Sequence, residues 1–255
     1  MNSSPRFVKS AKRLLRESAN RVLAGRGLEI VHQRIERSPL RQLMLALEHF
    51  RIDAVIDVGA NTGQFATELR GAGFAGDIHS IEPLPDAHAQ LARAADGYAR
   101  WHVLPRVAVG ADEQQVEMSI AGNSYSSSVL EMLDRHIAAA PDSAPIGKLS
   151  IAQRPLDWVM KGRIPAGAST LLKVDTQGYE FPVLEGAQEI LGTARLVLLE
   201  LSLQPLYRDQ KLWLELVAYM NARGFGVWSI QPEFCDPNTG QLLQVNGIFF
   251  RQAAG

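Results

Sequence analysis

The sequence predicts an α/β fold built on a mostly parallel sheet that ends in an antiparallel pair of strands. Strand and helix patterns alternate from residue 41 onward, as in a parallel sheet with crossover helices. A buried strand runs directly into a glycine-rich turn at 55–63. The last two apolar segments bracket the turn 236–240, which is typical of an antiparallel pair. These observations define the fold class.

The individual elements follow from apolar patterning and from turn residues. Pro182 fits the first turn of a helix, because N–H groups there have no partner within the helix and proline lacks this group. Gly224 ends another helix. We expect a further helix to start in the serine-rich segment 123–128. The predicted strands are 55–58, 77–81, 101–103, 107–109, 115–120, 148–153, 170–175, 196–200, 226–230 and 245–250, and the predicted helices are 85–95, 179–191 and 211–223.

Length and composition limit the domain count and the partners. The chain has 255 residues and 46% hydrophobic content, enough for one α/β domain at 41–255 after an arm at 1–40. A formal net charge of −1 argues against nucleic acid as the main partner. The single cysteine, Cys235, excludes an internal disulfide and favours a reducing, cytoplasmic compartment. No apolar run approaches the roughly 20 residues of a membrane span, so we expect a soluble or at most peripheral protein.

The arm is basic and amphipathic. Residues 1–40 carry nine Lys and Arg against three Glu, a net charge of +6 that leaves −7 for the remainder. Apolar side chains recur at helical spacing between Phe7 and Val22. We favour a helix that caps the domain or mediates homodimerisation, with its basic face in water. The alternative is peripheral contact with an anionic membrane or an acidic glycolipid.

The turn after the first strand has the pattern of a ligand-binding loop. Gly59 and Gly63 allow backbone N–H groups and the start of a helix to approach a ligand closely. Asn61 occupies the second glycine position of the dinucleotide pattern Gly-x-Gly-x-x-Gly, and Asp57 brings a negative charge that repels phosphate. These departures favour the cationic cofactor S-adenosyl-L-methionine over a nicotinamide or flavin nucleotide. The alternative is that the glycines only close a strand-to-helix turn.

A second acid supports the same cofactor. Glu82 follows the strand 77–81 and lies 25 residues after Asp57. This is near the roughly 20-residue spacing at which an acid on the second strand reaches the ribose hydroxyls of an adenine nucleoside. We therefore predict that Glu82 binds the ribose.

Acidic side chains end four of the predicted strands, namely Asp57, Glu82, Asp175 and Glu200. A single acid at such a position often caps the next helix. Four acids at the same edge of a sheet repel one another unless a cation, a partner or a ligand compensates them. The carboxyl ends of the strands, where open parallel sheets bind ligands, are therefore the predicted site.

The chain resembles the FkbM family of S-adenosylmethionine-dependent methyltransferases over roughly residues 50–250. The resemblance rests on the order and spacing of short pieces: Asp57 to Gln64, Ile81-Glu82-Pro83, Val107 to Gly110, Ser126 to Ser128, Pro155 to Asp157, Leu172 to Glu180, Leu184 to Ala187, and Leu199-Glu200. It implies a Rossmann-like class I methyltransferase sheet and O-methylation, commonly of sugar hydroxyls in glycolipids, polysaccharides or natural products. One departure is Gln177, where many members carry glutamate.

The resemblance also assigns cofactor residues. It implies that the turn residues contact S-adenosyl-L-methionine, that Pro83 lies beside Glu82 at the ribose, and that the region of Ala108 flanks the adenine. The turn residues so assigned are Asp57, Gly59, Ala60, Asn61 and Gly63.

Catalysis at a sugar hydroxyl requires activation, because the hydroxyl is a poor nucleophile. Transfer from a sulfonium needs in-line positioning together with a base or a cation. Asp175, Glu180 and Glu200 are the candidates, and Lys173 lies on the same strand face as Asp175, either as a catalytic group or as its buried partner. We favour a carboxylate as general base. The alternative is a Mg²⁺ ion held by Asp175 and Glu200.

The expected acceptor is a saccharide or another hydroxyl-bearing small molecule. Asp175 is followed by Thr-Gln-Gly-Tyr and not by the Asn/Asp-Pro-Pro-aromatic turn of methyltransferases that act on amino groups of nucleic-acid bases. A phenolic or macrolide-type acceptor is the alternative within enzymes. A non-catalytic nucleoside-binding module is the alternative outside them.

Overall fold

The fold is described from a computed structural model, which defines residues 18–23, 25, 35 and 38–253. The chain divides into two units, 1–42 and 43–255. In the first unit, residues 18–23 are helical. Most of the predicted basic arm lies outside the described residues. The second unit contains the sheet and the candidate site.

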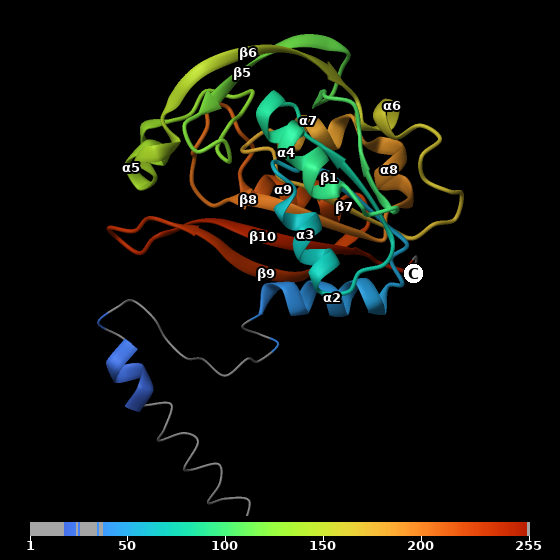
Figure 1. The fold of residues 1–255 in the computed structure, drawn as a ribbon, viewed down its shortest axis with the longest axis horizontal. Helices are drawn as coiled ribbons and strands as arrows, with labels where there is room; N and C mark the ends of the chain where they lie inside the picture. Colours follow the sequence, from blue (N-terminus) through green and yellow to red (C-terminus); the bar gives the residue numbers. More distant parts are fainter. Residues whose placement is uncertain (1–17, 24, 26–34, 36–37, 254–255) are drawn as a thin grey trace, which may run out of the picture. The chain divides into compact units, whose positions relative to one another are not determined.

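A seven-stranded sheet forms the centre of the second unit (Figure 1). Its strands are β1 (Ala54–Val58), β2 (Asp77–Ile81), β3 (Trp101–Val103), β7 (Thr170–Val174), β8 (Leu196–Ser202), β9 (Phe225–Cys235) and β10 (Leu242–Arg251). The strand order is β3-β2-β1-β7-β8-β10-β9. β10 runs antiparallel to both of its neighbours, and the other neighbouring pairs are parallel. The α/β fold class and the antiparallel C-terminal pair are thus confirmed.

The strand order reverses between β1 and β7. Because crossover connections are right-handed, the helix between β1 and β2 and the helices between β7 and β8 cover opposite faces of the sheet. Open parallel sheets bind ligands outside the carboxyl ends of their strands at such a reversal. Residues that follow β1, β2, β7 and β8 therefore meet at one edge.

The helices connect these strands. They are α2 (Pro39–His49), α3 (Gln64–Gly71), α4 (Pro85–Ala95), α5 (Asp134–Ala139), α6 (Leu156–Met160), α7 (Glu180–Glu185), α8 (Gln188–Thr193) and α9 (Trp213–Asn221), with a short 3₁₀ helix η2 (Pro141–Ser143). Pro85 starts α4 at a position where no intrahelical N–H bond is lost. The predicted helix 85–95 is confirmed to the residue.

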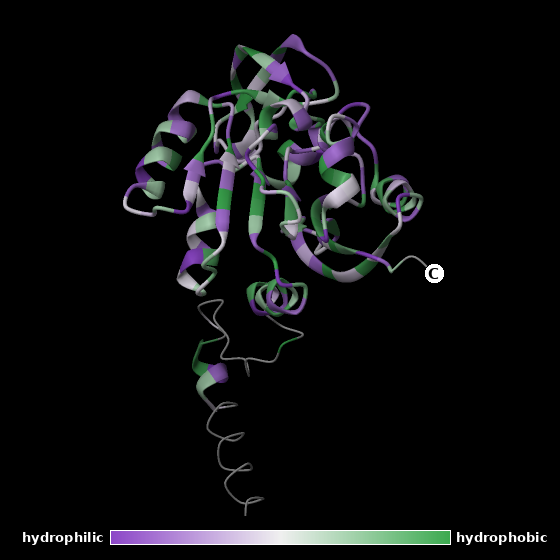
Figure 2. Ribbon diagram, turned by 90° about the vertical axis from the view of Figure 1, so that its right-hand side faces the viewer, coloured by the Kyte–Doolittle hydropathy of each residue, from purple (hydrophilic) through white to green (hydrophobic). Residues whose placement is uncertain are grey.

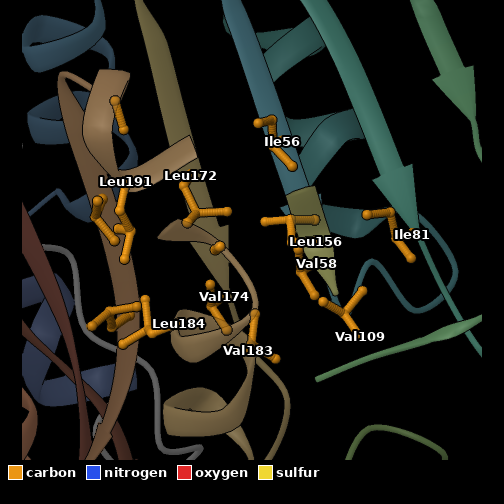
Figure 3. Packing of buried hydrophobic residues seen from close by; sticks show 14 of the residues in the cluster. Ile56, Val58, Ile81, Val109, Leu156, Leu172, Val174, Val183, Leu184 and Leu191 are labelled. Carbon is orange, nitrogen blue, oxygen red and sulfur yellow. The ribbon is translucent and has the colours of Figure 1, made fainter. Parts of the chain in front are cut away.

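The core lies between one face of the sheet and the helices α6 to α9. β1, β7 and β8 are buried along their whole length, which explains their almost continuous apolar sequences. Leu172 and Val174 of β7 belong to the same cluster as Val183 and Leu184 of α7 (Figure 3). Figure 2 shows the hydrophobic colour concentrated on the central strands, with more hydrophilic colour on the surrounding helices. This packing holds the strand ends in fixed positions.

A second, smaller sheet packs near the carboxyl ends of the main strands. Its strands are β4 (Ala108–Val109), β5 (Gln114–Ala121) and β6 (Pro145–Arg154), in the order β4-β6-β5. Ala108, Met118 and Ile151 form a buried cluster with Leu84 and Ala87. Leu84 directly precedes α4, and Ala87 lies in its first turn. Figure 1 shows β5 and β6 arching above the main sheet. The small sheet therefore forms a wall beside the residues that follow β2.

The predicted helix start at 123–128 is wrong, because this segment forms a loop and α5 begins only at Asp134. Its short polar side chains bind the local backbone. Asn123 Oδ1 accepts a hydrogen bond from the Ser126 N–H, and Ser127 Oγ accepts one from the Ala121 N–H. Such side-chain bonds compete with the helical pattern. Ser124 also adopts a left-handed backbone conformation, with φ of 57°.

The predicted helix 179–191 is divided into α7 and α8. Gly186 separates the two helices at a close contact, where an added Cβ would lie 2.1 Å from the backbone oxygen of Gly110. The Asp157 carboxylate then accepts hydrogen bonds from the N–H groups of Glu189 and Ile190 in the first turn of α8. A side chain remote in sequence therefore caps a new helix start. Local patterning could not reveal this contact.

Candidate active site

The turn after β1 is held against the end of β2 and against the loop after β7. The N–H groups of Gly59 and Ala60 both donate to the carbonyl of Ile81, at 3.1 and 3.0 Å. Gly59 has φ of 77°, and an added Cβ would lie 1.9 Å from the backbone oxygen of Asp175. Only glycine fits this close approach. The two segments thus form one continuous wall at the reversal of the strand order.

Asn61 connects this turn to Glu82. It has φ of 46°, and its N–H donates to Glu82 Oε2 at 2.9 Å. The other carboxylate oxygen of Glu82 accepts a bond from the Leu84 N–H at 2.8 Å. Burial raises the pKa of Glu82 to about 7, against the opposing effect of these two N–H groups. Glu82 is therefore a fixed acid that titrates near neutral pH.

Asp57 and Lys173 form a buried ion pair behind the turn. Lys173 Nζ lies 3.0 Å from Asp57 Oδ1, and the two residues are 5% and 0% exposed. The same ammonium donates to the carbonyl of Gly59 at 3.0 Å and lies 3.5 Å from Asp175 Oδ2. Burial alone would lower the pKa of Lys173, but Asp57 and Asp175 together raise it above its usual range. Lys173 therefore stays charged and ties the turn to Asp175.

Glu180 holds the loop after β7 in place by accepting hydrogen bonds from it. Its Oε1 atom accepts hydrogen bonds from the Thr176 N–H, the Thr176 hydroxyl and the Gly178 N–H, at 3.0, 3.2 and 3.1 Å. The side chain is 2% exposed, and burial raises its pKa to about 7. Its carboxylate is thus engaged by the loop that it supports.

Gln177 bridges Asp175, which directly follows β7, and Glu200, which lies in the adjacent strand β8 two residues before that strand ends. The Nε2 atom of Gln177 donates to Asp175 Oδ1 at 3.1 Å and to Glu200 Oε2 at 2.9 Å. The Tyr207 hydroxyl lies 2.9 Å from Gln177 Oε1. Burial raises the pKa of Glu200 well above its usual range, and the charges of Asp175 and Glu180 raise it further. The two carboxylates are thus held in one hydrogen-bonded group.

A cavity of about 370 Å³ lies among these elements. Its lining includes the apolar side chains of Leu84, Val107 and Met118 and the carboxylates of Asp175 and Glu200. Its size and mixed lining suit a small-molecule ligand. Of the residues proposed from the sequence, those that line the cavity are Gly59, Asn61, Glu82, Pro83, Ala108, Asp175 and Glu200. Those that are not among its lining residues are Asp57, Ala60, Gly63, Lys173 and Glu180.

Several lining residues escaped the sequence interpretation. Glu233 and Phe234 come from β9, and Gln244 comes from β10. Their side chains reach the cavity only because the antiparallel pair folds back beside β8. His136 also lines the cavity, and burial lowers its pKa to about 4, so the imidazole is neutral at pH 7. Gln177 lines the cavity as well, and the sequence marked it only as a departure from the glutamate that many FkbM-family members carry.

The part of the chain that the structure describes shows neither a metal-binding cluster nor a membrane-spanning helix. Within these residues there is no group of three or more His, Cys, Asp or Glu side chains placed to hold a metal ion. Over the same residues, no helix has the length and apolar character needed to cross a bilayer.

The sheet order and the cavity at the reversal of the strand order define the Rossmann-like fold of the class I methyltransferases. Comparison of sequences agrees with this class, because residues 57–227 match the model of the methyltransferase FkbM domain. The match covers more than half of the chain. The chain therefore belongs to the FkbM methyltransferase family. No curated protein matches it.

Solved structures of methyltransferases resemble the chain only distantly. Magnesium protoporphyrin IX methyltransferase from Synechocystis PCC 6803, solved with bound SAM, is 10% identical with a TM-score of 0.44, covering 94% of this chain and 97% of that one. An rRNA methylase from Streptococcus thermophilus is 12% identical with a TM-score of 0.44, covering 88% and 100%. The methyltransferase domain of bacterial CtHen1 is 10% identical with a TM-score of 0.46, covering 85% and 100%.

Proposed function

We propose that the chain is an S-adenosylmethionine-dependent O-methyltransferase that acts on a hydroxyl of a saccharide, either in a glycolipid, a polysaccharide or a glycosylated natural product. The observation that carries the proposal is a single cavity lined both by Gly59, Asn61 and Glu82 and by Asp175 and Glu200. Its first part suits an adenine nucleoside and its second part suits a hydroxyl acceptor. One small-molecule site thus combines the two groups that the reaction must bring together.

The first part of the cavity fits the cofactor. Gly59 lines the cavity without a side chain, so a ligand can approach its backbone closely. Glu82 is buried and oriented by two backbone N–H groups, which leaves further lone pairs on its oxygens for ribose hydroxyls. Val107, Ala108 and Met118 supply an apolar surface for the adenine ring. When bound, S-adenosylmethionine supplies an electrophilic methyl group.

The second part supplies a base. Asp175 lines the cavity directly after β7, and the ammonium of Lys173 lies 3.5 Å from its Oδ2 atom. In the proposed mechanism the acceptor oxygen forms a bond to the methyl carbon while the carbon–sulfur bond breaks, and the hydroxyl proton passes to the Asp175 carboxylate. Lys173 keeps the carboxylate oriented, and Gln177 fixes the distance between Asp175 and Glu200.

The choice of a saccharide rests on the charge and polarity of this part. Carboxylate, amide and hydroxyl groups gather there, including those of Glu233, Gln244 and Ser126, and such groups form hydrogen bonds with several hydroxyls at once. Its lining holds no Lys or Arg side chain within the described residues. A phosphate-rich nucleic acid would lack cationic partners in such a cavity.

Calorimetry with S-adenosylmethionine and its demethylated product tests the cofactor. We expect one site per chain, and Glu82→Ala should weaken binding by about 1–3 kcal/mol, the range for a lost charge-assisted pair of hydrogen bonds. Glu68→Ala, which removes an exposed acid from α3, is the matched control and should bind as the wild type does. Preferential binding of NAD would contradict the proposal.

An acceptor panel tests the substrate class. Transfer of a radiolabelled methyl group should occur to alkyl glycosides and not to catechol or to an oligonucleotide. Methylation of catechol would select a phenolic acceptor instead. Binding of the cofactor without transfer to any member of a broad panel of glycosides, phenols and macrolides would favour a non-catalytic nucleoside-binding module.

A further inference from the structure

We infer that Gln177 takes the place of a cation between Asp175 and Glu200, so that the acceptor is activated without a divalent metal. This inference rests on the proposed function, because it concerns the mechanism at the same site. Two carboxylates close together on adjacent strands are a natural pair of ligands for Mg²⁺, which prefers oxygen donors. Here an amide nitrogen of the chain itself lies within hydrogen-bonding distance of both carboxylates.

The amide has the right number of protons for this role. The Nε2 atom carries two hydrogens, and its two acceptors are Asp175 Oδ1 at 3.1 Å and Glu200 Oε2 at 2.9 Å. Each carboxylate therefore receives one hydrogen, and both donors of the amide are used. A metal ion at this position would have to displace both hydrogen bonds.

Tyr207 lies at the oxygen end of the Gln177 amide. Its hydroxyl lies 2.9 Å from Gln177 Oε1 and 3.0 Å from the carbonyl of Ser126, and the residue is 1% exposed. Burial raises the pKa of Tyr207 well above its usual range, so the hydroxyl keeps its single proton and can donate it to one of these two oxygens. With the amide reversed, its oxygen would face the Asp175 carboxylate with no donor between them. The observed orientation is thus the one that needs no cation.

The backbone of Gln177 is also held in place. It adopts φ of 56°, and its carbonyl accepts a hydrogen bond from the Ser128 hydroxyl at 2.7 Å. The next residue, Gly178, contacts the ring of Tyr207 so closely that an added Cβ would lie 2.9 Å from it. A non-glycine residue in a left-handed conformation is an uncommon and costly arrangement that tends to mark functional sites. The side chain is therefore positioned by contacts on both sides.

Groups of the chain offset part of the negative charge at the site. The ammonium of Lys173 lies 3.0 Å from Asp57 and 3.5 Å from Asp175, and the elevated pKa of Glu200 favours its neutral form. The other acids around this pair are Glu180, whose carboxylate is bound by its own loop, and Glu233, which accepts a bond from Asn246 at 2.7 Å. Two neighbouring carboxylates thus coexist with one amide and one ammonium as their nearest partners.

Binding of Mn²⁺ alone tests the inference without an acceptor. Electron paramagnetic resonance should detect no wild-type site with a Kd below about 1 mM, whereas Gln177→Glu should bind Mn²⁺ at least about tenfold more tightly, because a third carboxylate replaces the amide donor. Asp175→Asn combined with Gln177→Glu should lose this gain. The control Gln115→Glu adds the same charge at an exposed position of β5 and should leave Mn²⁺ binding unchanged.

Two outcomes would overturn the inference. The first is wild-type binding of Mn²⁺ with a Kd below about 1 mM that the Asp175→Asn substitution removes, because a metal ion would then displace the Gln177 amide. The second is a folded Gln177→Glu variant, checked by its unchanged thermal midpoint, that gains no affinity for Mn²⁺. Calorimetry of S-adenosylmethionine on the same samples separates this failure from a failure of the proposed function, which would appear as absent cofactor binding in the wild type.

Discussion

Lys173 and Asp57 form an ion pair with 3.0 Å between ammonium and carboxylate, in register across the adjacent strands β7 and β1. The pair is almost fully buried, and the Lys173 ammonium also donates to the carbonyl of Gly59. It therefore joins the two halves of the sheet at the point where the ligand cavity begins. The sequence pointed to Asp57 as a cofactor residue and to Lys173 as a partner of Asp175. In the structure, the carboxylate closest to the Lys173 ammonium is that of Asp57.

Removing one member of this pair should destabilise the fold. Lys173→Met leaves the Asp57 carboxylate buried without its cation, and loss of a buried partner typically costs about 3–5 kcal/mol. Chemical denaturation measures the change in the free energy of unfolding. The double variant with Asp57→Asn should cost less than the sum of the two single variants, with a coupling of about 1 kcal/mol or more. Additive costs would show that the two side chains do not interact.

The affinity for S-adenosylmethionine should depend on pH through Glu82. Its pKa is raised to about 7 by burial, so below that pH the side chain is increasingly protonated and can no longer accept from both ribose hydroxyls as an anion. We expect the Kd to be constant above about pH 8 and to rise by roughly tenfold per unit below pH 7. Calorimetry from pH 5.5 to 9 measures this. The Glu82→Gln variant should bind S-adenosylmethionine weakly, and its Kd should no longer depend on pH through this residue. A wild-type Kd that is constant from pH 5.5 to 9 would exclude Glu82 as the group responsible.

Glu180 should act on the loop and on stability, not on the acceptor. Glu180→Gln keeps an oxygen that can accept from Thr176 and Gly178, whereas Glu180→Ala leaves these buried donors unpaired and should cost about 1–3 kcal/mol. Hydrogen exchange at residues 175–178 should rise only in the alanine variant. If Glu180→Gln retains wild-type stability but loses transfer by about 10² or more, the carboxylate itself takes part in the reaction.

The same residue should leave a signature in the pH dependence of stability. Because the pKa of Glu180 is raised to about 7 in the folded chain, the folded state holds this proton more tightly than the unfolded state. Its contribution to stability is present below about pH 4.5 and is lost as the pH rises through 7. Relative to Glu180→Gln, the wild type should therefore lose unfolding free energy between pH 5 and pH 8. An unchanged difference across this window would mean that the two states share one pKa.

Asp175 should control transfer while sparing the cofactor. General bases typically supply 10²–10⁴-fold, so Asp175→Asn should lower turnover by about 10² or more with little change in the affinity for S-adenosylmethionine. Single-turnover assays with a glycoside acceptor and calorimetry measure the two effects separately. Wild-type turnover should survive exhaustive treatment with EDTA. Loss of activity on chelation, restored by Mg²⁺, would favour the metal mechanism, and a fully active Asp175→Asn variant would remove this residue from catalysis.

The basic arm, 1–40, offers a test of its two interpretations. Its net charge of +6 should attract anionic lipid at low salt and release it as salt screens the charges. Co-sedimentation with phosphatidylserine vesicles compares the full chain with a chain lacking residues 1–36. We favour a packing or dimerisation role, for which neither form binds vesicles and ultracentrifugation shows a smaller assembly after truncation. Vesicle binding that depends on the arm would support peripheral membrane contact instead.

The sequence by itself determined the fold class, the order of the strands along the chain and the residues at their carboxyl ends. These follow from local physics, since apolar runs with at most one charged residue, as in β1, β7 and β8, are buried as strands, and glycines after a buried strand mark a tight turn. Gly59 and Glu82 could be placed at the site for this reason. The serine-rich loop 123–128 and the break at Gly186 could not be predicted locally, because backbone bonds from remote or competing side chains decided them.

Only the tertiary structure decided which acids face the cavity and which support it. Asp57 and Glu180 carry the same charge as Asp175 and Glu200, so the sequence could not separate them. Their roles differ because Asp57 is paired with Lys173 and Glu180 is enclosed by its own loop. Gln177 is the clearest case, since its amide has a role only where two strands and Tyr207 converge on it. Long-range packing brings such partners together, and no local pattern encodes it.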